Sequence, residues 1–173
     1  QPGASLLRIL KDRERPRFDV MPPLGRALLH PELEGRIAAV ELAAHWKVKE
    51  LYAPVLRIAG DVKGDADLRD AALRALGSLG SKETIEILKK YVGPTDRIHP
   101  AALAAILELD AADAAREAAA ILRELKDTGR VAVILTDFAG REGAPALLAK
   151  ELVSRPLDSG QAERLRQAWV ATG

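Results

Sequence analysis

A unit of about 30 residues recurs along this chain of 173 residues, and that recurrence limits the folds open to it. Each copy has the pattern of a helix, a tight turn and a second helix. The first helices of the copies begin near residues 31, 66, 99, 130 and 160, which is a spacing of about 30 to 34 residues. Such units bury their apolar faces by stacking on one another. The sequence therefore predicts an all-α fold, a right-handed α-α superhelix of about five helix pairs.

The clearest copy runs from Asp65 to Gly93. Apolar residues recur in its first half at steps of three and four, which places them on one helix face: Leu68, Ala71, Ala72, Ala75, Leu76 and Leu79. Asp67 is predicted to cap the first turn of this helix. Gly80 is predicted to end it in a left-handed conformation. Ser81 is then expected to cap the second helix, whose buried stripe is Ile85, Leu88 and Val92.

The other copies follow the same order. Pro31 to Lys47 is predicted to form a first helix, followed by a second helix that Gly60 closes. Pro100 is placed to open a helix, because the first helical position needs no N–H. Asp110 is placed to cap the next helix. Its buried face is predicted to consist of Ala115, Ala118, Leu122 and Leu125. Gly129 is predicted to end this helix.

Two further segments complete the pattern. Residues 130–139 and 143–153 are predicted to form the fourth pair. Asp158 or Ser159 is predicted to cap a final helix. No linker rich in glycine, serine or proline divides the chain, so we expect one domain over residues 1–173.

Composition supports a helical core and restricts the chemistry. Hydrophobic residues make up 48% of the chain and aromatic residues only 3%, so the core must consist of Leu, Ala, Ile and Val. The 26 basic and 25 acidic residues nearly cancel, which is not the basic excess expected of a nucleic-acid-binding protein. The chain has no cysteine, which excludes disulfides and thiolate sites. No apolar run approaches the length of roughly 18 residues that a membrane span needs.

The first helix of the clearest copy resembles a known repeat. Residues 69–77 read Arg-Asp-Ala-Ala-Leu-Arg-Ala-Leu-Gly, which is similar to the first helix of a short HEAT-like repeat, the type also found in the phycocyanobilin lyase family. Residues 36–40 match this run well, and residues 99–103 match it in part, without the arginine. The resemblance covers nearly the whole chain. It implies a HEAT-like solenoid and leaves the function open, because this fold serves many roles.

A narrower resemblance concerns the stretch from Leu33 to Val92. It is similar to HEAT-like segments of large bacterial proteins that join a dehydrogenase-like β-propeller, a helical repeat region and a c-type haem domain. The haem attachment motif Cys-x-x-Cys-His is absent, so the resemblance would place this chain as the spacer between those domains. It implies a periplasmic or extracytoplasmic protein; without it, a cytoplasmic location is expected.

No residue pattern predicts catalysis, a metal site or a cofactor site. The three histidines, His30, His45 and His99, are followed by Pro, Trp and Pro, so the His-Glu pairs of di-iron HEAT enzymes are missing. His30 and His99 each precede a proline at a predicted helix start. A bilin-lyase-like cavity or a DNA-glycosylase-like groove would need more aromatic residues than the two Trp, two Tyr and two Phe present. Trp46 and Tyr52 are expected to pack between helices instead.

The outward positions of the predicted second helices carry charges of both signs, as a solvated or protein-binding face does. We therefore predict a non-catalytic protein-interaction or scaffold module that presents a curved helical surface. Its partner would be a protein or a neighbouring domain, and neither nucleic acid nor a membrane. The alternatives are a HEAT-fold enzyme or cofactor-binding protein, and a passive spacer in a larger redox protein. The predicted partner-binding residues are Lys82, Glu86, Lys89, Lys90, Arg116 and Arg123.

The two ends carry apolar residues that a single end helix cannot hide. Because stacked repeats need polar outer surfaces at their ends, we expect apolar surface near Leu7, Leu10, Leu165 and Trp169. The chain also begins without a methionine. Both features suggest a segment of a longer protein.

Overall fold

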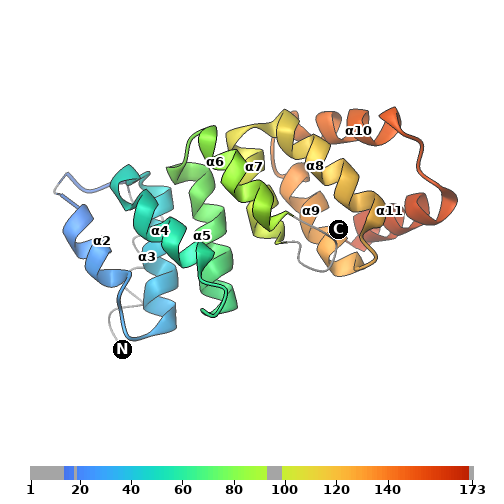
Figure 1. Cartoon of the computed structure of the whole chain (residues 1–173). Helices are drawn as coiled ribbons and strands as arrows, with labels where there is room; N and C mark the ends of the chain where they lie inside the picture. The colour runs from blue at the N-terminus through green and yellow to red at the C-terminus, as the bar shows by residue number, and fades with distance from the viewer. Residues whose placement is uncertain (1–13, 18, 93–98, 172–173) are drawn as a thin grey trace. The chain divides into compact units, whose positions relative to one another are not determined.

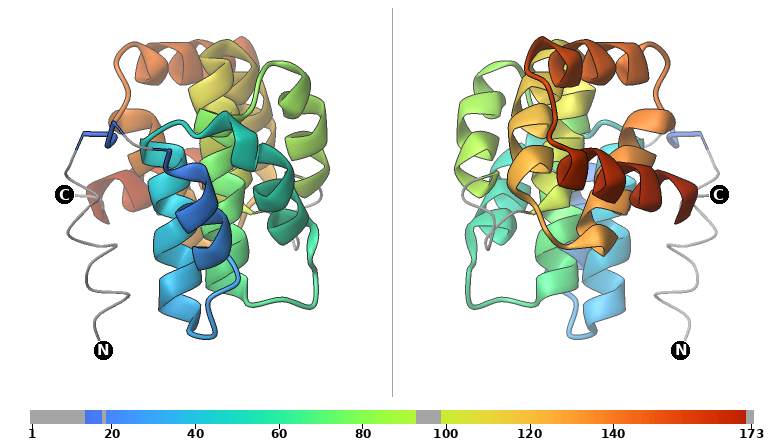
Figure 2. Two further views of the ribbon diagram at one scale, coloured as in Figure 1. Left: turned by 90° about the vertical axis from the view of Figure 1, so that its left-hand side faces the viewer. Right: turned by 90° about the vertical axis from the view of Figure 1, so that its right-hand side faces the viewer.

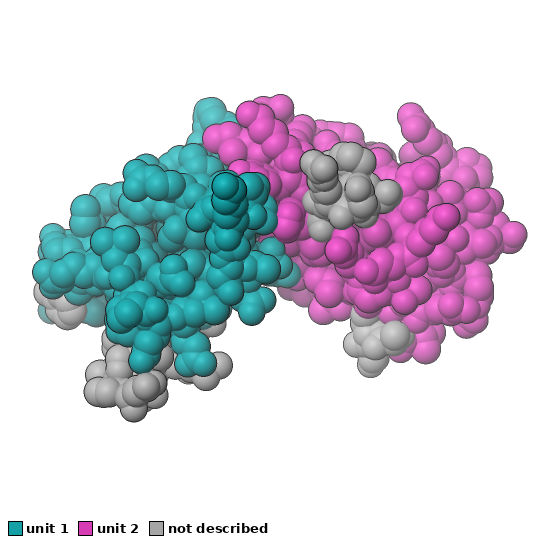
Figure 3. Space-filling model, turned by 60° about the horizontal axis from the view of Figure 1, so that its bottom comes forward, with its two compact units in different colours: residues 1–84 teal, residues 85–173 magenta. Residues whose placement is uncertain are grey.

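The computed structural model describes residues 14–17, 19–92 and 99–171. Over these residues the chain is helical and contains no strand, which confirms the predicted all-α fold. The chain divides into two compact units, Gln1–Thr84 and Ile85–Gly173 (Figure 3). Helix α6, Glu83–Leu88, begins in the first unit and ends in the second.

Unit 1 is built around two neighbouring helices. Helices α3 and α5 pack side by side, α4 packs against α5, and α2 lies against α3 (Figures 1 and 2). Leucine and valine side chains from α3, α4 and α5 form the core, among them Leu42, Val55 and Leu76. The elements of this unit before α6 are α2 (Met21–Ala27), α3 (Leu33–His45), η1 (Lys49–Leu51), α4 (Tyr52–Gly60) and α5 (Ala66–Leu79).

Unit 2 shows the stacking of helix pairs most clearly. Helix α7 packs against α8 and α9, α8 packs against α10, and α9 packs against α11 (Figures 1 and 2). First helices thus follow one another in one layer and second helices in the other, as the recurrence predicts. The elements after α6 are η2 (Lys89–Tyr91), α7 (Pro100–Leu109), α8 (Ala111–Glu124), α9 (Thr128–Ala139), α10 (Ala144–Ser154) and α11 (Ser159–Ala171).

Carboxylate caps begin several of these helices. Asp110 accepts hydrogen bonds from the backbone N–H groups of Ala112 and Asp113, both at 3.0 Å, so its predicted role as the cap of α8 is confirmed. The cap of α5 is Asp65, which accepts from the N–H groups of Asp67 and Leu68. The prediction of Asp67 as this cap was therefore wrong by two residues.

Two glycine predictions also need correction. Gly80 does follow α5, but its φ of −81° is not left-handed. Glycine is required there for space, because a Cβ atom would lie 2.5 Å from Oγ1 of Thr84 and 2.6 Å from the carbonyl oxygen of Leu76. Gly129 does not end α8, which stops at Glu124; it lies in the first turn of α9, which Asp127 caps by accepting from the N–H of Arg130 at 3.1 Å.

The left-handed conformation occurs instead at Lys47, with φ of 51°. The predicted first helix to Lys47 ends two residues earlier, at His45. The N–H of Lys47 donates to the carbonyl of Ala44 at 3.0 Å, and the N–H of Val48 donates to that of Ala43 at 2.9 Å. These are the two bonds of a Schellman motif, which satisfies the last carbonyls of a helix. Val48 is fully buried beneath the turn.

Cations from other elements satisfy several helix C-termini. Helices α5 and α7 have no basic residue in their own last turn. The ammonium of Lys49, in η1, donates to the carbonyls of Ser78 and Gly80 at the end of α5, at 2.7 and 3.1 Å. In unit 2, the guanidinium of Arg141 donates to the carbonyl of Glu108 near the end of α7, at 3.2 Å. A cation there also complements the negative end of the helix dipole.

The final helix exposes apolar side chains. Trp169 is 51% exposed and Val170 is 67% exposed, whereas Ala168 is buried and Leu165 is half-buried. Asp158 accepts from the N–H of Gln161 at 2.8 Å, so of the two predicted caps Asp158 fills the role. The apolar surface predicted near Leu7 and Leu10 lies outside the described residues.

Candidate interaction surface

The six predicted partner-binding residues lie on or beside α6, η2 and α8. Lys82 precedes α6 in unit 1, and the other five belong to unit 2. Four of the six are exposed to solvent, and the two that are partly buried are Lys89 and Arg123. The structure brings Glu86, Lys89 and Arg116 into one network of charges and gives Arg123 a separate role.

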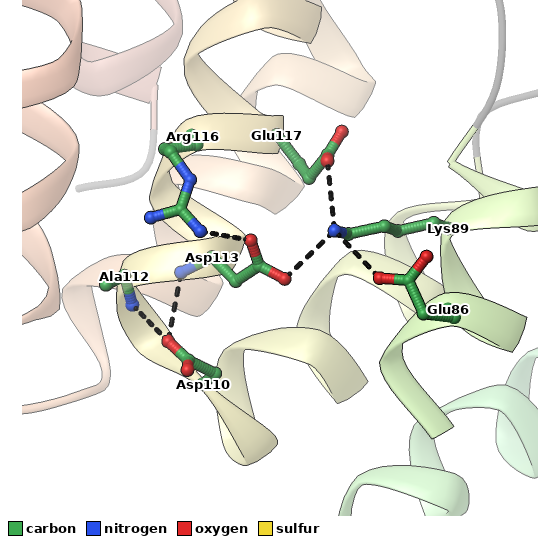
Figure 4. Close-up of polar contacts among 7 residues, drawn as sticks. All are labelled: Glu86, Lys89, Asp110, Ala112, Asp113, Arg116 and Glu117. Atoms are coloured by element: carbon green, nitrogen blue, oxygen red, sulfur yellow. Dashed lines mark hydrogen bonds and ion pairs between the residues drawn. The ribbon is translucent and has the colours of Figure 1, made fainter. Parts of the chain in front are cut away.

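Lys89 stands at the centre of this network, here called the Lys89 cluster: Glu86, Lys89, Asp113, Arg116 and Glu117 (Figure 4). The Lys89 ammonium lies 3.1 Å from a carboxylate oxygen of Asp113, 3.2 Å from one of Glu86 and 3.8 Å from one of Glu117. Glu86 belongs to α6, whereas the other two carboxylates belong to α8. One ammonium thus joins the α6–η2 segment to α8.

The start of α8 positions the nearest carboxylate of the cluster. Asp110 caps the helix, which places Asp113 in the first turn (Figure 4). There the helix dipole favours a negative charge. Arg116, one turn further along, donates to the other oxygen of Asp113. Asp113 therefore forms ion pairs with both Lys89 and Arg116, and its side chain is only 16% exposed.

The same contacts raise the pKa of Lys89 above its usual value. The largest cause is the hydrogen bond to Asp113, and the next is the hydrogen bond to Glu86. A raised lysine pKa means that the ammonium contributes stability below its ordinary pKa, and that this contribution is lost only as pH rises through the raised value. Lys89 therefore carries its positive charge at neutral pH.

Arg123 is engaged within unit 2. One nitrogen of its guanidinium donates to the carbonyl of Ala119 in its own helix at 2.7 Å. A second nitrogen, Nη2, is shared among the carbonyls of Glu151, Leu152 and Arg155 at the end of α10, at 3.2, 3.0 and 2.9 Å. Arg123 thus satisfies the C-terminus of another helix, as Lys49 does in unit 1. This role was not foreseen, because its acceptors lie about 30 residues further along the chain.

The carbonyl of Arg123 adds a link to the last helix. It accepts a hydrogen bond from the amide of Gln161 at 3.1 Å and one from the guanidinium of Arg164 at 3.4 Å. Residue 123 therefore joins α8 to both α10 and α11, which makes it a structural residue of the predicted set.

The histidines occupy structural positions. Nδ1 of His30 accepts from the N–H of Glu32 at 3.1 Å, and its ring lies so close to Gly35 that a Cβ there would be 2.7 Å from Nδ1. His99 precedes α7, with its ring edge-on to Tyr91 at a centroid distance of 6.5 Å. His99 is thus a helix-entry residue, as predicted, whereas the helix predicted to start at Pro31 begins at Leu33, three residues after His30. Within residues 14–17, 19–92 and 99–171, no group of three His, Asp or Glu side chains could hold a metal ion.

The predicted packing of Trp46 and Tyr52 is also found. Trp46 is buried, and the hydroxyl of Tyr52 accepts a hydrogen bond from Thr84 at 3.2 Å. Thr84 is itself buried and accepts from the N–H of Ser81 at 3.1 Å. These polar groups close the turn between α5 and α6.

Comparison with known proteins supports the repeat architecture. Residues 21–106 match the family model of HEAT repeats. The chain carries HEAT-like helical repeats. The matched HEAT stretch begins with α2 and ends within α7. No curated protein and no solved structure matches the chain. Among the described helices, none is long and apolar enough to cross a membrane.

Proposed function

We propose that this chain is a non-catalytic protein-interaction or scaffold module, and that the outer face of α6, η2 and α8 contacts the partner. The observation that carries the proposal is the Lys89 cluster, which holds Glu86 and Arg116 in place while leaving them 77% and 57% exposed. Charges fixed before binding lose less conformational freedom when a partner arrives. HEAT repeats are commonly protein-interaction scaffolds, and stacked repeats offer extended binding surfaces.

Charges of both signs on this face favour a protein partner with complementary charges. Glu86 would contact a basic side chain, while Lys90 and Arg116 would contact acidic ones. Such complementarity chiefly sets specificity and the rate of association. Arg123 is omitted from the proposed contacts because its guanidinium donates to the carbonyls of α8 and α10.

Lysine-directed cross-linking in an extract of the native host can test the proposal. We expect one recurring protein to be cross-linked through Lys90, the exposed lysine of this face in unit 2. Exposed lysines elsewhere, such as Lys63 and Lys150, serve as internal controls. Cross-links distributed evenly over all exposed lysines would argue against a defined face.

Binding by the purified partner then gives the quantitative test. Lys90→Glu combined with Arg116→Ala should weaken the affinity by roughly tenfold or more, which corresponds to about 1.4 kcal/mol. The matched control is Lys126→Glu, a charge reversal at an exposed position after α8, which should leave the affinity unchanged. Equal affinity of all three proteins would contradict the proposed face and favour the passive-spacer hypothesis.

The finer resemblances stay predictions. A phycocyanobilin-lyase-like activity predicts that the chain binds an open-chain tetrapyrrole, which an absorbance titration would detect. The spacer hypothesis predicts that the chain is flanked by propeller and haem domains in its parent protein. A catalytic or cofactor-dependent activity of the purified chain would contradict the non-catalytic part of the proposal.

A further inference from the structure

The Lys89 cluster has a charge balance that depends on one side chain. The cluster contains three carboxylates and two cations, so its formal charge is −1, and without Lys89 it would be −2. Arg116 lies on α8 beside Asp113 and pairs within that helix. Without Lys89, Glu86 of α6 would face Asp113 and Glu117 of α8 with no cation of the cluster between the two elements. Lys89 therefore turns a repulsive contact into an attractive one.

Solvent ions can reach this contact. The side chains of Lys89 and Glu117 are 30% and 35% exposed, and that of Glu86 is 77% exposed. Partly exposed charges are screened by salt, whereas fully buried pairs are screened much less. The flanking side chains of Leu88 and Val92 are both buried, so apolar packing holds the residues on either side of η2. None of the three residues of η2 itself is buried, so electrostatic attraction acts mainly on this short segment.

We infer that Lys89 is a salt-sensitive latch that fastens η2 to α8. Raising the ionic strength weakens the attraction and lets η2 open locally, while Leu88 and the helices of unit 2 stay packed. Opening changes the outer face, because it separates Lys89 of η2 from Asp113 and Glu117 of α8. This device is independent of the proposed function, since it needs no partner.

Two backbone hydrogen bonds report on the latch. The N–H of Val92 donates to the carbonyl of Lys89 at 3.1 Å, and the N–H of His99 donates to that of Tyr91 at 3.1 Å. Local opening of η2 would break both, so the exchange of these two amide hydrogens with deuterium measures it. The amide of Ile134, in the core helix α9, serves as the reference for changes that affect the whole unit.

The experiment compares exchange at about 0.1 M and about 1 M salt, between which the screening length falls from about 10 Å to about 3 Å. In the wild-type chain, exchange at Val92 and His99 should become roughly two- to tenfold faster relative to Ile134. In Lys89→Met the sign should reverse, because salt then screens the repulsion between Glu86 and the two carboxylates of α8. Lys90→Met, a change at the exposed neighbour, should behave as the wild type does.

Two results would overturn the latch: wild-type exchange that does not respond to salt, or a Lys89→Met response of the same sign and size as the wild type. If circular dichroism shows that Lys89→Met does not fold, Glu117→Gln replaces it. This substitution removes one carboxylate from the ammonium at an exposed position. It should make the salt response of η2 smaller, and an unchanged response would refute the latch.

Discussion

Lys47 holds the least favourable backbone conformation among the described residues other than glycine. Its φ of 51° lies in the left-handed region, where a Cβ atom crowds the neighbouring carbonyl. The Schellman bonds of Lys47 and Val48 and the buried Val48 side chain hold it there. The chain thus accepts local strain at the end of α3 in order to bring η1 and α4 back onto the core.

Lys47→Gly should therefore stabilise the chain by about 0.5 to 1 kcal/mol, since glycine adopts this conformation without the Cβ penalty. Urea unfolding followed by circular dichroism measures the change. Lys47→Ala is the matched control, because alanine loses the long side chain but keeps the Cβ. If alanine stabilises as much as glycine, the effect comes from the side chain and the strain argument is wrong.

Individual residues also show how far the sequence could predict the structure. Asp110 was correctly identified as a cap because it is the one carboxylate just before a clear apolar stripe. Asp65 and Asp67 are both acidic, and only the extended backbone of Asp65 decides which one caps α5. The charges of the Lys89 cluster could be predicted as a mixed-charge face. Their pairing could not, because Asp113 lies in another helix and its distance from Lys89 depends on how the helices pack.

Helices of this chain are joined at their ends as well as along their faces, and Arg123 is the clearest case. Its guanidinium bonds to carbonyls of α8 and α10, and its own carbonyl accepts from α11. A single guanidinium can do this because its donors are fixed in a planar fork.

Arg123→Ala should destabilise the chain by about 1.5 to 3 kcal/mol, the range for hydrogen bonds that involve a charged group. Arg123→Lys should recover only part of this loss, because an ammonium cannot reproduce the fork. The control is Arg116→Ala, whose exposed ion pair should contribute about 0 to 1 kcal/mol. Chemical denaturation of the three variants gives the comparison. A loss for Arg123→Ala no larger than that for Arg116→Ala would show that the carbonyls of α10 are satisfied without it.

The outer face of α11 carries a different electrostatic feature. Arg166 donates two hydrogen bonds to the Glu163 carboxylate, at 2.7 and 2.9 Å, and Gln167 donates a third at 2.8 Å. The bonds from Arg166 and then Gln167 lower the pKa of Glu163 from 4.5 to about 2. Any stability that the ionised Glu163 adds is present above its unfolded pKa and is lost as pH falls through about 2.

Nuclear magnetic resonance titration of the Glu163 carboxyl carbon should give a midpoint near 2 in the wild-type chain. Arg166→Ala should raise this midpoint toward the usual glutamate value, because it removes the largest cause of the shift. Gln167→Ala should raise it less. A wild-type midpoint at the ordinary value would mean that these surface contacts are not formed in solution.

The whole chain consists of two compact units whose cores are separate in sequence. Leu76 is fully buried in unit 1, and Ile106 is fully buried in unit 2. In stacked repeats, stability is approximately a sum of the stabilities of individual repeats and of the interfaces between neighbouring repeats. A core substitution should therefore destabilise its own unit more than the other unit.

Leu76→Ala should cost about 2 to 5 kcal/mol, the usual range for a buried leucine. Hydrogen exchange should show the greatest loss of protection in α5, which carries Leu76, and in α3, which packs against α5. Ile106→Ala is the matched change in unit 2 and should affect α7 and α8 most. If both variants lower protection evenly along the whole chain, the two units unfold as one.

The cations donated between helices restrict how such repeats could be exchanged or transplanted. Lys49 precedes α4 but satisfies carbonyls 29 and 31 residues further on, at the end of α5. Arg123 of α8 does the same for α10. A helix pair cut out at its turns would lose the cation that binds the C-terminal carbonyls of one of its helices. It would also take with it a cation that binds the C-terminal carbonyls of a helix in another pair. For protein engineering, a portable helix pair must therefore keep the basic residue that closes its helices, whether that residue precedes the closed helix, as Lys49 and Arg123 do, or follows it, as Arg141 does. An insertion between the two would separate donor from acceptor.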